Sequence, residues 1–242
     1  MSHESDCEVT NVTEPPATKR LKYKMDDQLT RTIRTDYDKL AKEYAQRIFD
    51  ELRHKPLDRT LLDRFAAAVK GRGDVSDIGC GPGQVARYLH DRGVSAFGLD
   101  LSPGMVQQAR ELNPGISFHE GDMLHLEIPG GSLAGITAFY AIVNIPARHH
   151  EAIFAEMLRV LQPDGLLLLA FHVGNKLIQE KELWGHKISM DFFLLPTDGV
   201  RRDLEAAGFA IEEIIEREPY PDVEYPSRRA YIFARKPAIL GC

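Results

Sequence analysis

The segment from Asp77 to Gly83, with the sequence DIGCGPG, combines residue types and spacings that suit the binding of a small ligand. Its glycines, Gly79, Gly81 and Gly83, lie between a short apolar segment that predicts a strand and a segment that predicts a helix. Glycine permits backbone angles that other residues rarely adopt, and it lets the main chain approach a ligand closely. In open α/β folds such a turn lies at the carboxyl edge of the sheet, where ligands bind. The segment therefore predicts a cofactor loop.

The spacing of these glycines and the acid that precedes them favour one cofactor over another. Dinucleotide-binding turns have the pattern GxGxxG and place a pyrophosphate at a helix N-terminus. This chain has GxGxG, with Gln84 at the sixth position, and Asp77 stands two residues before the first glycine. A carboxylate at that position would repel a pyrophosphate but suits a cationic amino group. S-adenosylmethionine carries an ammonium group and no phosphate, so the loop favours this cofactor.

Two further acids follow predicted strands and add candidate contacts. Asp100, about twenty residues beyond the glycines, can accept hydrogen bonds from both hydroxyls of a ribose. That position alone does not discriminate, because dinucleotide enzymes use an acid there as well. Asp122 can accept from the exocyclic amine of adenine, Met123 can pack on the adenine ring, and Leu101 is expected to add an apolar wall.

The strings DIGCGPG, GLDLSPGMVQQAR, GDM and LRVLQPDGLLLL together resemble the class I S-adenosylmethionine-dependent methyltransferase family. The resemblance extends over roughly residues 35–237 and is strongest over residues 75–170. It implies a doubly wound α/β fold with a mostly parallel seven-stranded sheet of order 3-2-1-4-5-7-6, whose last strand is antiparallel. It also implies that Asp77 and the loop glycines face the methionine moiety, Asp100 the ribose, and Asp122 with Met123 the adenine.

The segment TDYDKLAKEYA resembles the N-terminal helix that covers the cofactor in related enzymes. Tyr37 and Tyr44 are therefore candidate cofactor contacts, although their helical spacing is equally compatible with a place in the core. Residues 28–56 are accordingly predicted to form a helical lid on a methyltransferase domain of residues 28–237. Residues 1–27 are polar and poor in large apolar groups, which predicts a disordered tail.

The elements that position these residues alternate along the chain, which predicts a parallel sheet with right-handed crossovers. A turn is expected at Pro163 to Gly165, before an unbroken apolar run typical of a central strand. The expected helices span 29–52, 58–70, 84–92, 147–161 and 197–207, with another beginning at Ser102-Pro103. The expected strands span 74–78, 94–100, 116–120, 133–140, 166–171, 210–217 and 229–235.

The acceptor is expected to bind in loops at the carboxyl ends of the strands, namely 140–144, 172–196 and 219–228. Residues 172–196 are interpreted as a substrate-cap insertion. The candidate acceptor contacts are Tyr140, Trp184, Tyr220 and Arg228. A methyl sulfonium is already activated, so no fixed catalytic group is required, and His172 and His186 are the candidate bases. A structural or surface role is the alternative for each histidine.

Composition limits the class of acceptor and partner. The net charge of −6 disfavours a nucleic-acid partner, and Asn144-Ile145-Pro146 does not match the (D/N)PP(Y/F) motif of base and glutamine methylation. No apolar run approaches the roughly 20 residues that span a bilayer, and no metal-ligand spacing occurs, so we expect a cytoplasmic enzyme without a metal. A small-molecule acceptor is the favoured interpretation. The alternatives are a catalytically silent S-adenosylmethionine-binding regulatory protein and a protein or nucleic-acid methyltransferase; the oligomeric state is left open.

Overall fold

The computed structural model describes residues 27–238 of the chain, so almost all of the predicted tail lies outside the described residues. The helices are α2 Asp27–Ile48, η2 Glu51–His54, α3 Pro56–Val69, α4 Gln84–His90, α5 Pro103–Leu112, η3 Ala147–His149, α6 His150–Val160 and α7 Thr197–Ala207. The strands of the main sheet are β1 Asp74–Ile78, β2 Ala96–Asp100, β3 Phe118–Glu120, β4 Leu133–Phe139, β5 Leu161–Val173, β10 Ala210–Arg217 and β11 Arg228–Arg235.

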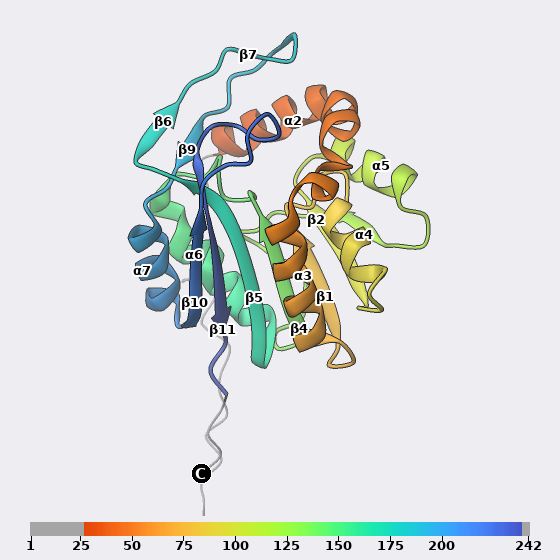
Figure 1. Cartoon of the computed structure of the whole chain (residues 1–242), viewed down its shortest axis with the longest axis vertical. Helices are drawn as coiled ribbons and strands as arrows, with labels where there is room; N and C mark the ends of the chain where they lie inside the picture. The colour runs from red at the N-terminus through yellow and green to blue at the C-terminus, as the bar shows by residue number, and fades with distance from the viewer. Residues whose placement is uncertain (1–26, 239–242) are drawn as a thin grey trace, which may run out of the picture.

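Seven strands form one sheet in the order β10-β11-β5-β4-β1-β2-β3, which confirms the predicted strand order (Figure 1). Strands β1 to β5 pair in parallel. Strand β11 runs antiparallel to both of its neighbours, β5 and β10. The last strand is therefore inserted beside the edge strand, and the carboxyl ends of β1, β2, β3 and β4 meet at one edge of the sheet.

Helices cover both faces of the sheet because alternate residues of its central strands are apolar on each side. Along β5, Leu166, Leu168 and Ala170 pack with side chains of α3 and α4. The intervening residues of the strand pack with side chains of α6 and α7 on the opposite face. Both faces of the central strands are thus buried, as the unbroken apolar run predicts.

Several predicted boundaries shift in the structure. The first helix ends at Ile48 rather than at residue 52, and the short η2 leads to Pro56, which opens α3. Residues 147–161 begin with the 3₁₀ turn η3, and the α-helix α6 starts only at His150. The turn expected at Pro163 to Gly165 is an irregularity within β5, where the pairing with β4 jumps from Leu161 to Leu166.

Residues 174–196 form two small two-stranded ladders above the sheet edge, β6 Lys176–Ile178 with β9 Phe192–Leu194, and β7 Glu182–Leu183 with β8 His186–Lys187. They lie at the same end of the molecule as α2 (Figure 1). The buried carboxylate of Asp36 on α2 accepts hydrogen bonds from the backbone N–H groups of Ser189 and Met190. This segment and α2 are therefore fastened to each other over the carboxyl ends of the strands.

Among residues 27–238, no helix is both long enough and apolar enough to cross a membrane.

Candidate functional site

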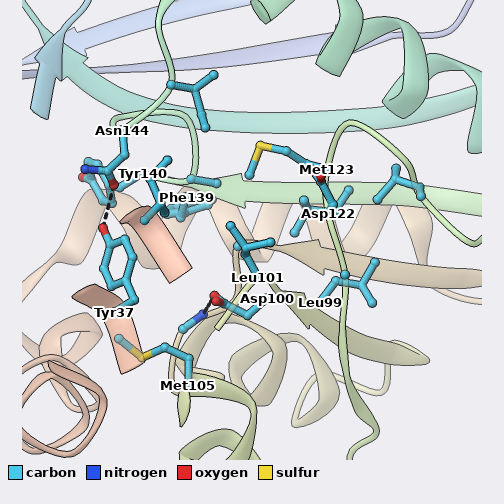
Figure 2. A pocket seen from close by; sticks show the side chains of 18 of the residues that line it. Tyr37, Leu99, Asp100, Leu101, Met105, Asp122, Met123, Phe139, Tyr140 and Asn144 are labelled. Atoms are coloured by element: carbon cyan, nitrogen blue, oxygen red, sulfur yellow. Dashed lines mark hydrogen bonds between the residues drawn. The ribbon is translucent and has the colours of Figure 1, made fainter. Parts of the chain in front are cut away.

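A pocket opens at the carboxyl ends of β1 to β4, beneath α2, and encloses about 760 Å³ of space that is partly continuous with solvent. Figure 2 shows Asp122 and Met123 at one end of this pocket, and Tyr37, Tyr140 and Asn144 at the other. Side chains from α2, the glycine loop and four strand ends line it: Ile33, Tyr37, Tyr44, Ile78, Gly79, Gly81, Leu99, Asp100, Leu101, Met105, Gly121, Asp122, Met123, Leu126, Phe139, Tyr140, Ala141, Asn144 and Ile145.

The glycine loop adopts the left-handed backbone conformation that the three glycines make accessible. Gly79, Gly81 and Gly83 have φ angles of 69°, 51° and 84°. A Cβ at Gly79 would lie 2.6 Å from the Cβ of Ala141, and one at Gly83 would lie 2.7 Å from the ring of Phe118. Gly79 and Gly81 line the pocket, whereas Gly83 caps α4 and lies outside the lining. The loop is thus shaped by backbone conformation and by close packing beneath it.

Gly81→Ala is expected to weaken cofactor binding more than it weakens the fold. The added methyl group would project into the pocket, where the nearest atom, Cε1 of Tyr44, is 3.7 Å away. Gly115 also has a positive φ, of 90°, and no heavy atom within 4 Å of an added Cβ. Gly115→Ala therefore controls for backbone strain. Calorimetry should show at least about tenfold weaker S-adenosylmethionine binding for Gly81→Ala and little change for Gly115→Ala; equal affinities would contradict the assignment of the loop.

Asp100 lies at the end of β2, and its carboxylate joins the loop to the next helix. Oδ2 accepts a hydrogen bond from the backbone N–H of Gly81 at 2.8 Å, and Oδ1 accepts from that of Ser102 at 2.9 Å. Burial raises the pKa of Asp100 to about 6, although these N–H donors oppose the shift. Each carboxylate oxygen can accept more than one hydrogen bond, so this side chain has acceptor capacity left for a ligand in the pocket.

Asp122 and Met123 follow β3 and line the pocket together with Leu101. The Oδ1 atom of Asp122 accepts a hydrogen bond from the backbone N–H of Leu124 at 2.9 Å, which fixes the carboxylate at the strand end. The pocket therefore brings Asp100 and Asp122, predicted to contact ribose and adenine, to one cavity together with two apolar side chains.

Asp77 lies at the end of β1 but outside the pocket lining. Its carboxylate is buried, and Oδ1 accepts a hydrogen bond from the hydroxyl of Thr137 on β4 at 2.8 Å. Burial raises the pKa of Asp77 to about 7, against the opposing hydrogen bonds from Thr137 and the Ala86 backbone. Asp77 thus lies behind the loop, and a direct contact with the methionine moiety stays a prediction.

Tyr37 and Tyr44 on α2 both line the pocket. Their rings pack edge to face with centroids 6.0 Å apart. The hydroxyl of Tyr37 donates to Oδ1 of Asn144 at 2.7 Å (Figure 2). The Nδ2 atom of Asn144 donates in turn to the carbonyl of Asp191. The pocket is therefore closed from above by α2, which is tied to the loop after β4 and to residues 174–196.

Tyr140 is the predicted acceptor contact that lines the pocket. It follows β4 with a φ of 56°, a conformation rarely adopted by residues other than glycine. Behind its ring, Lys55 lies 5.2 Å from the centroid and is ion-paired with Glu51 at 2.6 Å and Glu224 at 3.3 Å. These buried charges hold the end of β4 against the segment that joins η2 to α3 and against the loop before β11.

The two candidate bases lie outside the pocket lining. His172 is packed against Tyr140, with ring centroids 4.9 Å apart, and its Nδ1 lies 2.8 Å from the hydroxyl oxygen of Ser227. Burial, together with the neighbouring Arg229 and Lys55, lowers the pKa of His172 to about 3, so the imidazole is neutral at neutral pH. His186 lies in β8, within residues 174–196. Neither position favours direct proton transfer in the pocket.

The remaining predicted acceptor contacts are engaged elsewhere. Trp184 packs on the outer side of Tyr44, with centroids 5.7 Å apart. The hydroxyl of Tyr220 accepts from the backbone N–H of Leu57 at 3.1 Å, and its ring packs under Arg217. Arg228 is half exposed and forms ion pairs with Glu216 and Glu218. All three residues lie outside the pocket lining, and their contact with an acceptor stays a prediction.

Sequence reasoning missed Met105 and the role of Asn144, both of which line the pocket. Met105 is an apolar residue in the first turn of α5, and its backbone N–H donates to the hydroxyl of the helix cap Ser102. An apolar residue in the first turn of the helix that follows β2 was therefore a usable signal for a pocket contact. Asn144 lies at the end of the predicted acceptor loop 140–144, but the sequence alone assigns it no contact of its own. The hydrogen bond between Asn144 and Tyr37 joins residues 107 positions apart, and no local sequence pattern predicts such a contact.

Among residues 27–238, no group of three or more His, Cys, Asp or Glu side chains is arranged to hold a metal ion.

Comparison with known proteins agrees with this arrangement. A family model described as a methyltransferase domain matches residues 75–165, from β1 into β5. The structure is also similar to that of an S-adenosylmethionine-dependent methyltransferase from Methanosarcina mazei, with a TM-score of 0.62 and 17% identity over 69% of this chain and 93% of the other. At 17% sequence identity, this similarity is evidence for a shared fold only.

Two curated relatives each match part of the chain. Trans-aconitate 2-methyltransferase of Methylobacterium nodulans is 36% identical over 112 residues, which are 44% of this chain and 40% of the relative. The 2-methyl-6-phytyl-1,4-hydroquinone methyltransferase of Synechocystis is 37% identical over 101 residues, 40% of this chain and 31% of the relative. The matched part thus spans well under half the length of either relative. Together with the strand order and the glycine loop, the matches show that this chain contains a class I S-adenosylmethionine-dependent methyltransferase domain.

Proposed function

We propose that the chain transfers a methyl group from S-adenosylmethionine to a small-molecule acceptor. The observation that carries the proposal is the position of Asp100, a half-buried carboxylate in the pocket lining with unused acceptor capacity, beside a loop whose glycines have left-handed backbone angles. Burying a carboxylate is costly without partners, so its retention in the pocket is consistent with a ligand that donates hydrogen bonds to it.

The residues present fit this cofactor. Asp100 would accept from the ribose hydroxyls, Asp122 from the adenine amine, and Leu101 with Met123 would enclose the base. Gly79 and Gly81 leave the room that a methionine moiety requires, since a Cβ at either would point at pocket-lining side chains. The bound cofactor supplies a methyl group already activated by the positive sulfonium.

The remaining task of the protein is to orient the acceptor and to exclude water. Helix α2 and residues 174–196 cover the pocket and are joined through Asp36, Tyr37 and Asn144, an arrangement that suits the exclusion of water. Tyr140 and Phe139 line the pocket at the carboxyl end of β4. We infer that the acceptor enters there and that an already nucleophilic acceptor needs no base from the protein.

The names of the relatives support a small-molecule acceptor without fixing which one. One relative is named for a methyl transfer to trans-aconitate and the other for a transfer to a hydroquinone with a long apolar chain. These acceptors differ widely in charge and polarity. The common class, an organic metabolite, is the part that we carry over to this chain.

The proposal is tested first by thermal unfolding of the full chain. S-adenosylmethionine at about a hundred times its Kd is expected to stabilise the chain by about 2.7 kcal/mol and to raise the unfolding temperature by several degrees, whereas NAD should leave it unchanged. Stabilisation by NAD alone would contradict the cofactor assignment.

A second measurement separates an enzyme from a silent binding protein. The full chain is incubated with methyl-labelled S-adenosylmethionine and a metabolite library, and labelled products are identified by mass spectrometry. A labelled metabolite supports the proposal. The same incubation is then repeated with peptides and nucleic acids as acceptors. If the chain binds the cofactor but labels none of these acceptors, the result favours a silent regulatory protein.

A further inference from the structure

Three tyrosine rings gather beside the glycine loop, and the geometry of two of them is set by α2. Tyr37 and Tyr44 are seven residues apart, two helical turns, so both side chains lie on the face of α2 that covers the pocket. Cε1 of Tyr44 would be 3.7 Å from a Cβ at Gly81, so its ring lies across the loop within contact distance of any group bound there. Trp184 packs against Tyr44 and supports it.

The third ring, that of Tyr140, comes from the opposite wall. It lines the same pocket from the end of β4 and is held in a left-handed backbone conformation. The rings of Tyr37 and Tyr44 pack edge to face with centroids 6.0 Å apart, and the side chain of Tyr140 lines the same pocket. We call Tyr37, Tyr44 and Tyr140 the tyrosine cage.

The hydroxyl of Tyr37 is not available to a ligand, whereas its ring lines the pocket. The hydroxyl of Tyr37 is committed to Asn144, whose amide is committed in turn to the carbonyl of Asp191. Burial raises the pKa of both Tyr37 and Tyr44, so their phenols stay neutral at physiological pH. The attraction of these rings for a ligand therefore comes from the negative electrostatic potential above a ring face, which favours cations.

The charged side chains around the cage also favour a bound cation. The carboxylate of Asp100 lines the same pocket as the three rings. The ammonium of Lys55, beside Tyr140, is neutralised by ion pairs with Glu51 and Glu224. Arg47 lies over Trp184, on the outer side of the cage, and pairs with Glu43. A cation placed within the cage would thus meet aromatic faces and carboxylates.

We propose that the tyrosine cage recognises the positive charge of the sulfonium, so that the pocket holds the methyl donor more firmly than its neutral, demethylated product. The inference rests on the proposed function and concerns one step of it. Loss of the methyl group converts the sulfonium to an uncharged thioether, and the attraction of the rings falls at that moment. The cage would therefore help to release the product without any change in the contacts to ribose and adenine.

The test compares three ligands by calorimetry at pH 7.5: S-adenosylmethionine, S-adenosylhomocysteine, and sinefungin, which carries an amine in place of the methyl sulfonium. Tyr44→Leu removes a ring, whereas Tyr44→Phe keeps it. For Tyr44→Leu we expect the affinity for S-adenosylmethionine to fall about tenfold more than that for S-adenosylhomocysteine, with sinefungin following the cationic ligand. Tyr44→Phe should keep the parent ratio of the two affinities.

Tyr140→Leu and Tyr140→Phe repeat the comparison from the opposite wall, in case Tyr44→Leu does not fold. Tyr88→Leu, a half-buried tyrosine on α4 whose ring packs on Arg92 outside the pocket, should leave the ratio unchanged. Equal losses for the charged and neutral ligands in the leucine variants would overturn the inference and leave the proposed function intact. Failure of the parent chain to bind any of the three ligands would instead contradict the proposed function itself.

Discussion

Asp100→Asn is expected to weaken the binding of S-adenosylmethionine by about a hundredfold or more. A carboxylate that accepts two ribose hydroxyls makes two charge-assisted hydrogen bonds, each worth about 1.5–3 kcal/mol. The amide keeps only one oxygen, and its NH₂ group would face either the N–H of Gly81 or that of Ser102, both of which now donate to the carboxylate. The variant therefore loses ligand contacts and the connection between the loop and α5.

Calorimetry with S-adenosylmethionine and S-adenosylhomocysteine measures this loss. Asp74→Asn is the matched control, because Asp74 is an exposed carboxylate at the other end of the neighbouring strand β1. Its affinity should equal that of the parent chain. If a folded Asp100→Asn variant binds S-adenosylmethionine with an affinity within about threefold of that of the parent chain, Asp100 does not contact the ligand.

The pH dependence of binding gives the same prediction a second readout. The pKa of Asp100 in the free protein is raised to about 6 by burial, so the carboxylate is ionised at pH 7.5 and protonated at pH 5. Ligand hydroxyls bind the ionised form, and affinity should therefore fall as the pH drops through about 6. This part of the pH dependence should disappear in Asp100→Asn.

Asp77→Asn is expected to stabilise the fold at pH 8 while it weakens cofactor binding. Burial raises the pKa of Asp77 to about 7 in the folded chain, whereas an unfolded aspartate titrates near 3.9. Between these values the folded chain keeps a proton that the unfolded chain has released. The free energy of unfolding therefore falls as the pH rises from about 4 to about 7, by up to about 4 kcal/mol, and stays low above pH 7.

An asparagine resembles the protonated carboxyl group and does not titrate. The two proteins should thus be about equally stable near pH 4, and the variant should gain by about 1–4 kcal/mol toward pH 8. Urea unfolding without cofactor, followed across this pH range, measures the difference, and Asp74→Asn should show none. A variant that is less stable than the parent at pH 8 would mean that Asp77 is held by favourable interactions rather than retained for its charge.

A gain in stability with a loss of affinity would give Asp77 a definite role. The carboxylate of Asp77 lies behind the loop and outside the pocket lining. Its charge would therefore act on the ammonium group of the ligand across the loop or through a bridging group, without direct contact between the two. Natural binding sites commonly keep such destabilising groups where function requires them.

Much of the fold was predictable because local patterns determine where elements begin and end. The glycines after β1, Ser102 with Pro103 at the start of α5, and Gly208 after α7 each set a boundary through backbone conformation or capping. Alternation of strands and helices then requires parallel pairing, and parallel strands bring their carboxyl ends to one edge. For this reason Asp100, Asp122 and the first two loop glycines, Gly79 and Gly81, could be assigned to one pocket from their order in the chain.

The acceptor end was less predictable because contacts between distant residues decide it. The sequence could not show that Arg228 would pair with Glu216 and Glu218, or that the buried charges of Lys55 and Glu224 would hold the end of β4. A side chain in a loop can point to solvent, to the core or to a pocket, and only its packing partners select among these. Residue types and their order thus determined which strand ends and which glycines meet at the pocket. The tertiary structure decided which of the aromatic residues line that pocket, since that choice depends on contacts such as the one between Tyr37 and Asn144.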